Sequence, residues 1–167
     1  MSDDGDAPDQ DAPQGSADPG GPGSAAGAFS GPQAGELIDE LLQDPVTGGG
    51  TGTTASEVLT AALRAVNETG DVLDTGEGWR GIAAVALLLS EAAPRLLDAA
   101  PRADELRRYL ARWDTELTPA RRTLCSAVLR RLGLQAENEW FADVTRQAFE
   151  GGPAALLTPL EGILADS

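Results

Sequence analysis

The sequence predicts an all-α protein: an irregular or orthogonal bundle of six or seven helices, preceded by a disordered acidic N-terminal tail. Apolar residues recur at helical spacing along most of the chain after residue 28. No stretch alternates with the period of two that is typical of strands. Residues 81–90 (GIAAVALLLS) carry no charge and are apolar nearly all round a helix. Such a helix belongs in a core, with other helices around it, and this one is too short to span a bilayer.

The N-terminal tail is defined by its composition. Residues 1–28 contain six Asp and no basic or aromatic residue, so they bury too little apolar surface to offset their chain entropy. We therefore expect two parts, a disordered tail (1–28) and a single helical domain (29–167). The tail is interpreted as a solvating leader, with an acidic arm that docks on a basic surface as the alternative.

Two amphipathic helices are expected before the central one. The first begins at Pro32, which suits an initial helical position, and ends near Gln43. The second begins at a capping box formed by Thr54 and Glu57, and Gly70 fits its C-terminal end. The residues expected on their buried faces are Leu37, Ile38, Leu41, Leu42, Val58, Leu59, Ala62, Leu63 and Val66.

Two groups of acidic residues in this half could bind a cation. The first, on the polar side of the first helix, comprises Glu36, Asp39 and Glu40; it could also bind a basic partner, but it is better explained as a solvated face. The second surrounds the turn before the central helix, but its spacing fails the EF-hand pattern. Two of its members, Asp74 and Glu77, form a capping box for the central helix. We therefore predict no metal site from Asp71, Asp74 and Glu77.

A short helical turn and four further helical segments follow the central helix. Pro94 and Pro101 bracket a short turn, and an amphipathic helix follows Pro101. The next helix begins at Thr118-Pro119 and ends at Gly133. A shorter one ends before Gly151, and Thr158-Pro159 indicates a fresh helix start in the last segment. The expected buried residues are Leu96, Leu97, Leu106, Tyr109, Leu110, Trp113, Leu124, Cys125, Val128, Leu132, Trp140, Phe141, Val144, Ala148, Leu156, Leu157, Leu160, Ile163 and Leu164.

The residue census excludes several kinds of chemistry. The chain has no His, which excludes Ser-His-Asp, Cys-His and His-metal sites. All 12 basic residues are Arg, so Schiff-base chemistry and a phosphate-loop Lys are excluded too. We predict no catalytic, cofactor-binding or metal-ligating residue and no cofactor. Cys125 is alone and no signal peptide is recognised, so we expect a reducing cytoplasm and a buried, unreactive thiol.

The net charge of −15 limits the choice of partners. It argues against nucleic acid and against anionic membranes, and it favours a basic protein partner or simple solubility. The charge is uneven, because residues 95–131 hold nine Arg and five acids. The Arg pairs there could hold an anion, but we favour internal pairing with neighbouring acids. These pairs are Arg107-Arg108, Arg121-Arg122 and Arg130-Arg131.

Three stretches together resemble one family. They are GAFSGPQAGELIDEL (27–41), the acidic turn and Ala-rich helix of 59–93, and RRTLCSAVLRRLGLQAENEWFADV (121–144). They are similar to the bacterial domain-of-unknown-function family 4259, across most of residues 27–165. Asn138-Glu139-Trp140 stands where members have a Ser-Glu-Leu-like helix start. The resemblance implies a compact helical domain in bacteria, and the family has no established reaction to transfer.

Three functions are compatible with the sequence. The favoured one is a non-enzymatic protein–protein interaction or regulatory domain, because the census leaves no familiar catalytic group. The second is an immunity-type protein whose acidic face neutralises a basic toxin such as a nuclease. The third is an enzyme that uses only carboxylates and Arg, and it ranks last because capping or solvation explains each candidate acid.

Overall fold

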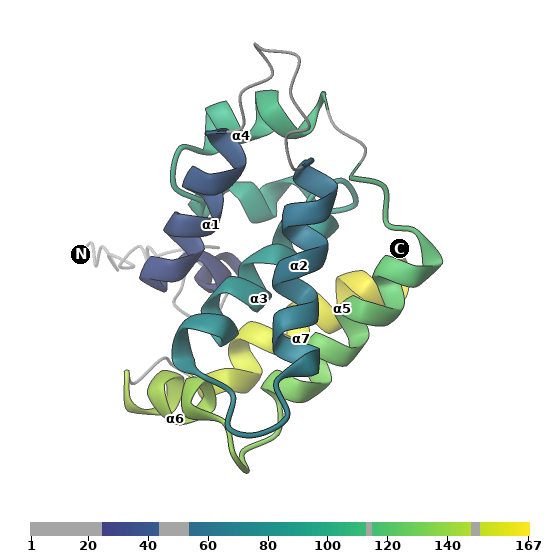
Figure 1. Ribbon diagram of the computed structural model, residues 1–167. Coiled ribbons are helices and arrows are strands. Elements are labelled where there is room, and N and C mark those ends of the chain that lie inside the picture. The colour runs from purple at the N-terminus through teal and green to yellow at the C-terminus, as the bar shows by residue number, and fades with distance from the viewer. Residues whose placement is uncertain (1–24, 44–53, 113–114, 148–150) are drawn as a thin grey trace, which may run out of the picture.

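The computed structural model describes residues 25–43, 54–112, 115–147 and 151–167. Within these ranges the chain forms seven α-helices and two 3-10 helices and no strand, which confirms the predicted all-α class (Figure 1). The elements are η1 (Ala25–Phe29), α1 (Pro32–Leu42), α2 (Ala55–Glu68), α3 (Thr75–Leu89), η2 (Pro94–Ala99), α4 (Ala103–Leu110), α5 (Pro119–Leu132), α6 (Glu139–Arg146) and α7 (Gly152–Asp166).

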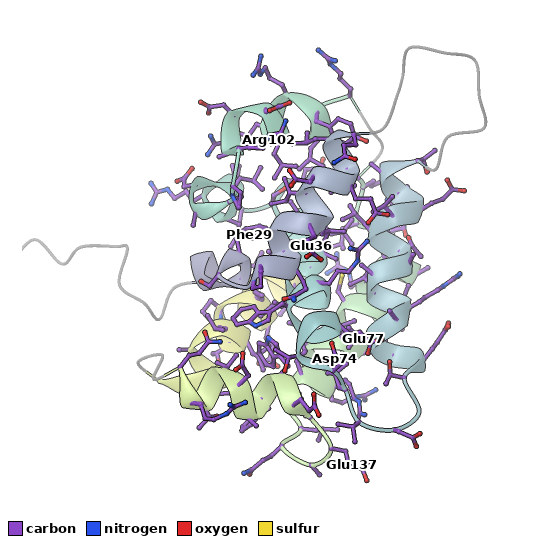
Figure 2. The ribbon with its side chains drawn as sticks, turned by 60° about the vertical axis from the view of Figure 1, so that its left-hand side comes forward. Phe29, Glu36, Asp74, Glu77, Arg102 and Glu137 are labelled. Carbon is purple, nitrogen blue, oxygen red and sulfur yellow. The ribbon has the colours of Figure 1, made fainter. Side chains whose placement is uncertain are left out.

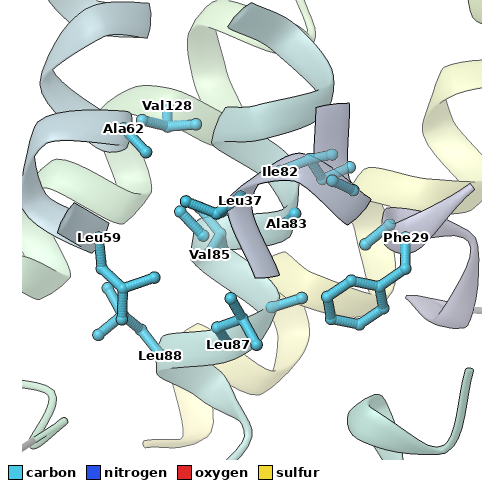
Figure 3. Close-up of a cluster of buried hydrophobic side chains, with 14 of the residues drawn as sticks. Phe29, Leu37, Leu59, Ala62, Ile82, Ala83, Val85, Leu87, Leu88 and Val128 are labelled. Carbon is cyan, nitrogen blue, oxygen red and sulfur yellow. The ribbon is translucent and has the colours of Figure 1, made fainter. Parts of the chain in front are cut away.

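Helix α3 is the centre of the bundle. It contacts α1, α2, α5, α6, α7 and both 3-10 helices. Every residue from Gly81 to Ser90 is buried, so no face of this stretch meets solvent. Figure 3 shows Leu37, Leu59 and Val128, from three other helices, in the same cluster of buried side chains as Val85 and Leu88. The prediction of a core helix apolar on all sides is confirmed.

The helix starts follow from capping side chains, with one correction. At α2 the predicted box is complete, because Glu57 and Thr54 each accept a hydrogen bond from the other's backbone N–H. At α3 the Asp74 carboxylate accepts from the N–H groups of Gly76 and Glu77, at 2.7 and 3.3 Å. Glu77 does not return the bond, because it accepts instead from the Thr69 hydroxyl at 3.0 Å. The predicted capping box at α3 is therefore right for the Asp74 side chain and wrong for the Glu77 side chain.

The predicted fresh helix start at Thr158-Pro159 is also wrong. Helix α7 runs without interruption from Gly152 to Asp166 and contains Pro159 in its interior. A Pro there removes one intrahelical hydrogen bond, a loss of about 3 kcal/mol. Buried leucines on both sides of the Pro keep the helix continuous against α5, α6 and η1, and together they outweigh that loss. They are Leu156, Leu157, Leu160 and Leu164.

The folded part begins earlier than residue 29. Residues 25–28 belong to η1, and Ala28 is only 1% exposed in the core. Small side chains let η1 pack closely against α3, α7 and η2, which composition alone did not indicate. The rest of the predicted tail, residues 1–24, lies outside the described residues, as do Trp113 and Ala148.

Two buried tryptophans join α3 to α6. The rings of Trp79 and Trp140 meet edge to face, with centroids 5.7 Å apart and planes at 77°. A Cβ atom at Gly31 would overlap the Trp79 ring, and one at Gly78 would overlap the Trp140 side chain. Glycine is therefore needed at both positions for the tryptophans to fit.

Candidate protein-interaction surface

Arginines neutralise the acids at the end of the molecule where α1, η2 and α4 meet. Arg102 donates to Asp39 at 3.0 Å and to Glu105 at 2.8 Å, and hydrogen bonds to these carboxylates raise the pKa of Arg102. Arg80 is ion-paired with Glu40, and the third acid of the predicted α1 cluster, Glu36, is exposed. The first acidic group is thus largely taken up by ion pairs within the protein.

Most of the Arg pairs of residues 95–131 are also used internally. Arg107 is ion-paired with Asp98 and Asp104, and Arg108 donates to the Asp104 carbonyl at 3.2 Å. Arg121, Arg122 and Arg131 each donate to a backbone carbonyl: those of Glu116, Leu164 and Asp71. Arg130 is exposed and has no such partner among the described residues. Pairing with neighbouring acids, the favoured interpretation, is thus found at Arg107, whereas Arg108, Arg121, Arg122 and Arg131 are held by backbone carbonyls.

Asp71, Asp74 and Glu77 do not form a metal site in the structure. Asp74 caps α3, Glu77 accepts from Thr69, and the Asp71 side chain is exposed. Across the four described ranges, no group of three or more His, Cys, Asp or Glu side chains is arranged to hold a metal ion. None of the helices in those ranges is long and apolar enough to cross a membrane.

A shallow pocket of about 490 Å³ lies between the end of α3, η2 and α4. Its apolar wall includes Pro94 and Leu97, and its polar groups include Ser90 and Arg107. The Ser90 hydroxyl donates to the Leu87 carbonyl at 2.6 Å, and Arg107 is held by its two acids. Ser90 and Arg107 are therefore engaged in the fold rather than aimed at a ligand.

Cys125 is fully buried on α5. Desolvation raises the pKa of its thiol to about 12, against a smaller opposing effect of Arg121 and Arg122. The thiol is thus held in its unreactive, protonated form at neutral pH, as a buried hydrophobic residue.

The opposite end of the molecule is built from two connections that are fastened to each other. We call them the bridged loops: residues 69–74, between α2 and α3, and residues 133–138, between α5 and α6. The Leu73 N–H donates to the Glu137 carbonyl at 2.8 Å, and the Glu139 N–H donates to the Leu73 carbonyl at 2.9 Å. These bonds make a single parallel bridge between Leu73 and Asn138. Arg131 adds a bond to the Asp71 carbonyl at 2.7 Å.

Asn138 joins the second loop to both of the helices that flank it. Its side chain is 5% exposed, and its amide donates to the carbonyls of Arg131, Leu132 and Leu134 at 2.9–3.2 Å. Its oxygen accepts from the Phe141 N–H at 2.9 Å and caps α6. The side chain thereby satisfies the end of α5 and the start of α6 at once.

The bridged loops carry the large exposed hydrophobic residues of the described chain. These are Val72, 48% exposed, and Leu134, 51% exposed. Val72 lies between Asp71, which bonds Arg131, and Leu73, which bonds Glu137. Leu134 lies on the other loop, between Arg131 and Glu137, the residues that bond to Asp71 and Leu73. The two apolar side chains are thus brought to one end of the molecule from positions 62 residues apart in sequence.

The bridged loops and the helix ends next to them also carry acids that form no ion pair. We define the acidic rim as Glu68, Asp71, Glu137 and Glu139, all of which are exposed. None of the ion pairs found among the described residues involves a member of the rim. Figure 2 shows Glu137 near Asp74 and Glu77 at this end, far from Arg102 at the other. The rim carboxylates thus lack the ion pairs with arginine that are found at the α1 and α4 end.

Sequence reasoning did not identify this surface. Asp71 was noted only as a possible ligand, and Val72 and Leu134 were not considered. The available signal was a large apolar residue in each of two otherwise polar turns, TGDVLD and GLQAEN. Only the bridge through Leu73 shows that the two turns share one surface.

Comparisons with known proteins add no relative. No protein-family model matches the chain, and searches of curated proteins and of solved structures return no significant match. The resemblance to family 4259 therefore stays a prediction, and the function has to be argued from the surface itself.

Proposed function

We propose that this chain is a non-enzymatic interaction domain that binds another protein through the bridged loops. The observation that supports this most is the exposure of Val72 and Leu134 in two sequence-distant loops that are joined through Leu73 and Asn138. Exposed large apolar side chains with a polar rim are typical of protein-binding sites, where a few central residues supply most of the binding energy.

The hydrogen bonds within and between the loops support the same proposal. A surface that is already ordered loses little conformational entropy when a partner binds. The bridge through Leu73 and the hydrogen bonds of Asn138 supply that order before any partner arrives. Cys125, alone and buried, suits a reducing compartment, so the cytoplasm is where we propose to seek the partner.

An immunity-type protein is the more specific second candidate. The acidic rim favours it, because unpaired carboxylates around an apolar centre suit a positively charged enzyme surface. In that case the bridged loops would cover the basic active site of a toxin such as a nuclease. A toxin gene beside the gene for this chain would support this narrower function.

Affinity capture from the native cell tests the proposed function. We expect the intact chain to retain a partner that the Val72→Ser/Leu134→Ser variant loses, since both apolar contacts are removed. The matched control is Ala154→Ser/Ala165→Ser, which adds two hydroxyls at exposed positions of α7. Equal capture by all three proteins, each folded by circular dichroism, would contradict the proposal.

A further inference from the structure

We propose that the partner presents a basic surface with an apolar side chain at its centre, which contacts Val72 and Leu134 while its cations meet the acidic rim. This inference rests on the proposed function and adds the chemistry of the partner. It is carried by the charges that the fold leaves unneutralised at this end.

All the charged residues in the two segments that form the surface are acidic. Residues 68–78 hold four acids and no Arg, and residues 132–140 hold two acids and no Arg. Three arginines flank the two segments: Arg80 is paired with Glu40, whereas Arg130 and Arg131 reduce the local charge from −6 to −4. Such a surface attracts a cationic partner and repels an anionic one.

Glu137 is a rim acid whose charge is not used within the described part of the fold. Glu137 has φ +54°, in the left-handed region that normally favours Gly. A non-Gly residue there costs about 1 kcal/mol or more. The other described non-Gly residue with positive φ, Arg102, makes two ion pairs with Asp39 and Glu105. The Glu137 carboxylate has no hydrogen bond or ion pair within the described part of the chain, so its charge serves no evident purpose in the fold.

Position and charge together define how the partner would fit. The apolar pair supplies the contact that excludes water, and the rim contributes mainly to the association rate and to the choice of partner. Because the rim is exposed, its contribution should fall as salt screens it, with a Debye length of about 8 Å at 0.15 M.

Titration of the isotope-labelled full chain with three synthetic peptides of equal length, followed by NMR, tests this inference. The first peptide contains Arg and Leu, the second replaces Arg by Glu, and the third replaces Leu by Ser. We expect the Arg/Leu peptide to shift amide signals of residues 70–74 and 134–139, with the other two binding on the order of tenfold more weakly. We expect added salt to weaken the Arg/Leu peptide most.

Two variants with the same change in net charge make the test specific. Glu68→Gln/Glu137→Gln should weaken the Arg/Leu peptide, whereas Glu161→Gln/Asp166→Asn on α7 should leave its affinity unchanged. If the Glu/Leu peptide binds the bridged loops as tightly as the Arg/Leu peptide, the inferred partner chemistry is overturned and the interaction surface stands. If no peptide shifts these loops, both the inference and the proposed surface are overturned.

Discussion

Leucine-to-alanine substitutions at two positions test which leucine lies in the core and which lies on the interaction surface. Leu88 on α3 is 2% exposed, whereas Leu134 on the bridged loops is 51% exposed. Both substitutions remove the same atoms, so their difference reports burial alone. We expect Leu88→Ala to cost about 2–5 kcal/mol, the range for a large core side chain that leaves a cavity. Leu134→Ala should stay within about 0.5 kcal/mol, as surface substitutions usually do.

Thermal unfolding followed by far-UV circular dichroism measures the difference. At about 3 °C per kcal/mol for a domain of this size, Leu88→Ala should lower the midpoint by about 6–15 °C. Leu134→Ala should lower it by about 2 °C at most. Equal midpoints for the two variants would refute the assignment of Leu88 to the core and of Leu134 to the free surface.

Leu88→Asp gives the same distinction in a sharper form. An unpaired carboxylate in the core costs more than a cavity does, so this variant should not fold. A variant that stays folded but no longer associates with a partner would move the binding site onto α3.

Three further predictions follow from single positions. Gly78→Ala should destabilise the fold by about 1–3 kcal/mol, because the added methyl group overlaps Trp140. Gly162→Ala, on the open side of α7, should instead stabilise it by about 0.5–1 kcal/mol. Chemical denaturation distinguishes the two variants, and similar effects on stability would contradict the close packing at Gly78. Because the pKa of Cys125 is raised in the folded state, the thiol ionises at a lower pH in the unfolded state, and stability should fall as the pH rises from about 9 towards 12. Cys125→Ala should lack this decline. Parallel curves of stability against pH for the two proteins would refute the burial effect. Glu137→Gly should be about 1 kcal/mol more stable than Glu137→Ala, because only Gly adopts positive φ without strain; equal denaturation midpoints would show that the strain is absent.

The helices were largely predictable because they depend on local sequence. Periodic apolar residues and the capping pair of Thr54 and Glu57 act over a few residues, so α1 and α2 appear near the expected ends. Pro159 shows the limit of this reasoning. Its local preference to end a helix is overridden by buried leucines whose contacts lie on distant elements. Glu77 likewise bonds Thr69 from the preceding loop instead of completing the local capping box.

The candidate surface could not be predicted from the sequence because it depends on contacts between distant turns. Sequence shows that Val72 and Leu134 each lie in a polar turn, where a single exposed apolar residue is ordinary. Their shared location depends on the Leu73–Asn138 bridge, which joins residues 65 positions apart. The unneutralised rim is equally invisible, since only the fold shows which acids the arginines reach.

Site-specific photo-crosslinking in the native cell is the most direct test of the central claim, that the bridged loops bind another protein. A photoreactive amino acid is placed in turn at positions 72, 134 and 145, the last being an exposed site on α6. We predict that positions 72 and 134 cross-link to the same basic protein, and that position 145 does so far less. Cross-links of equal yield from all three positions, or to different proteins from positions 72 and 134, would contradict the claim.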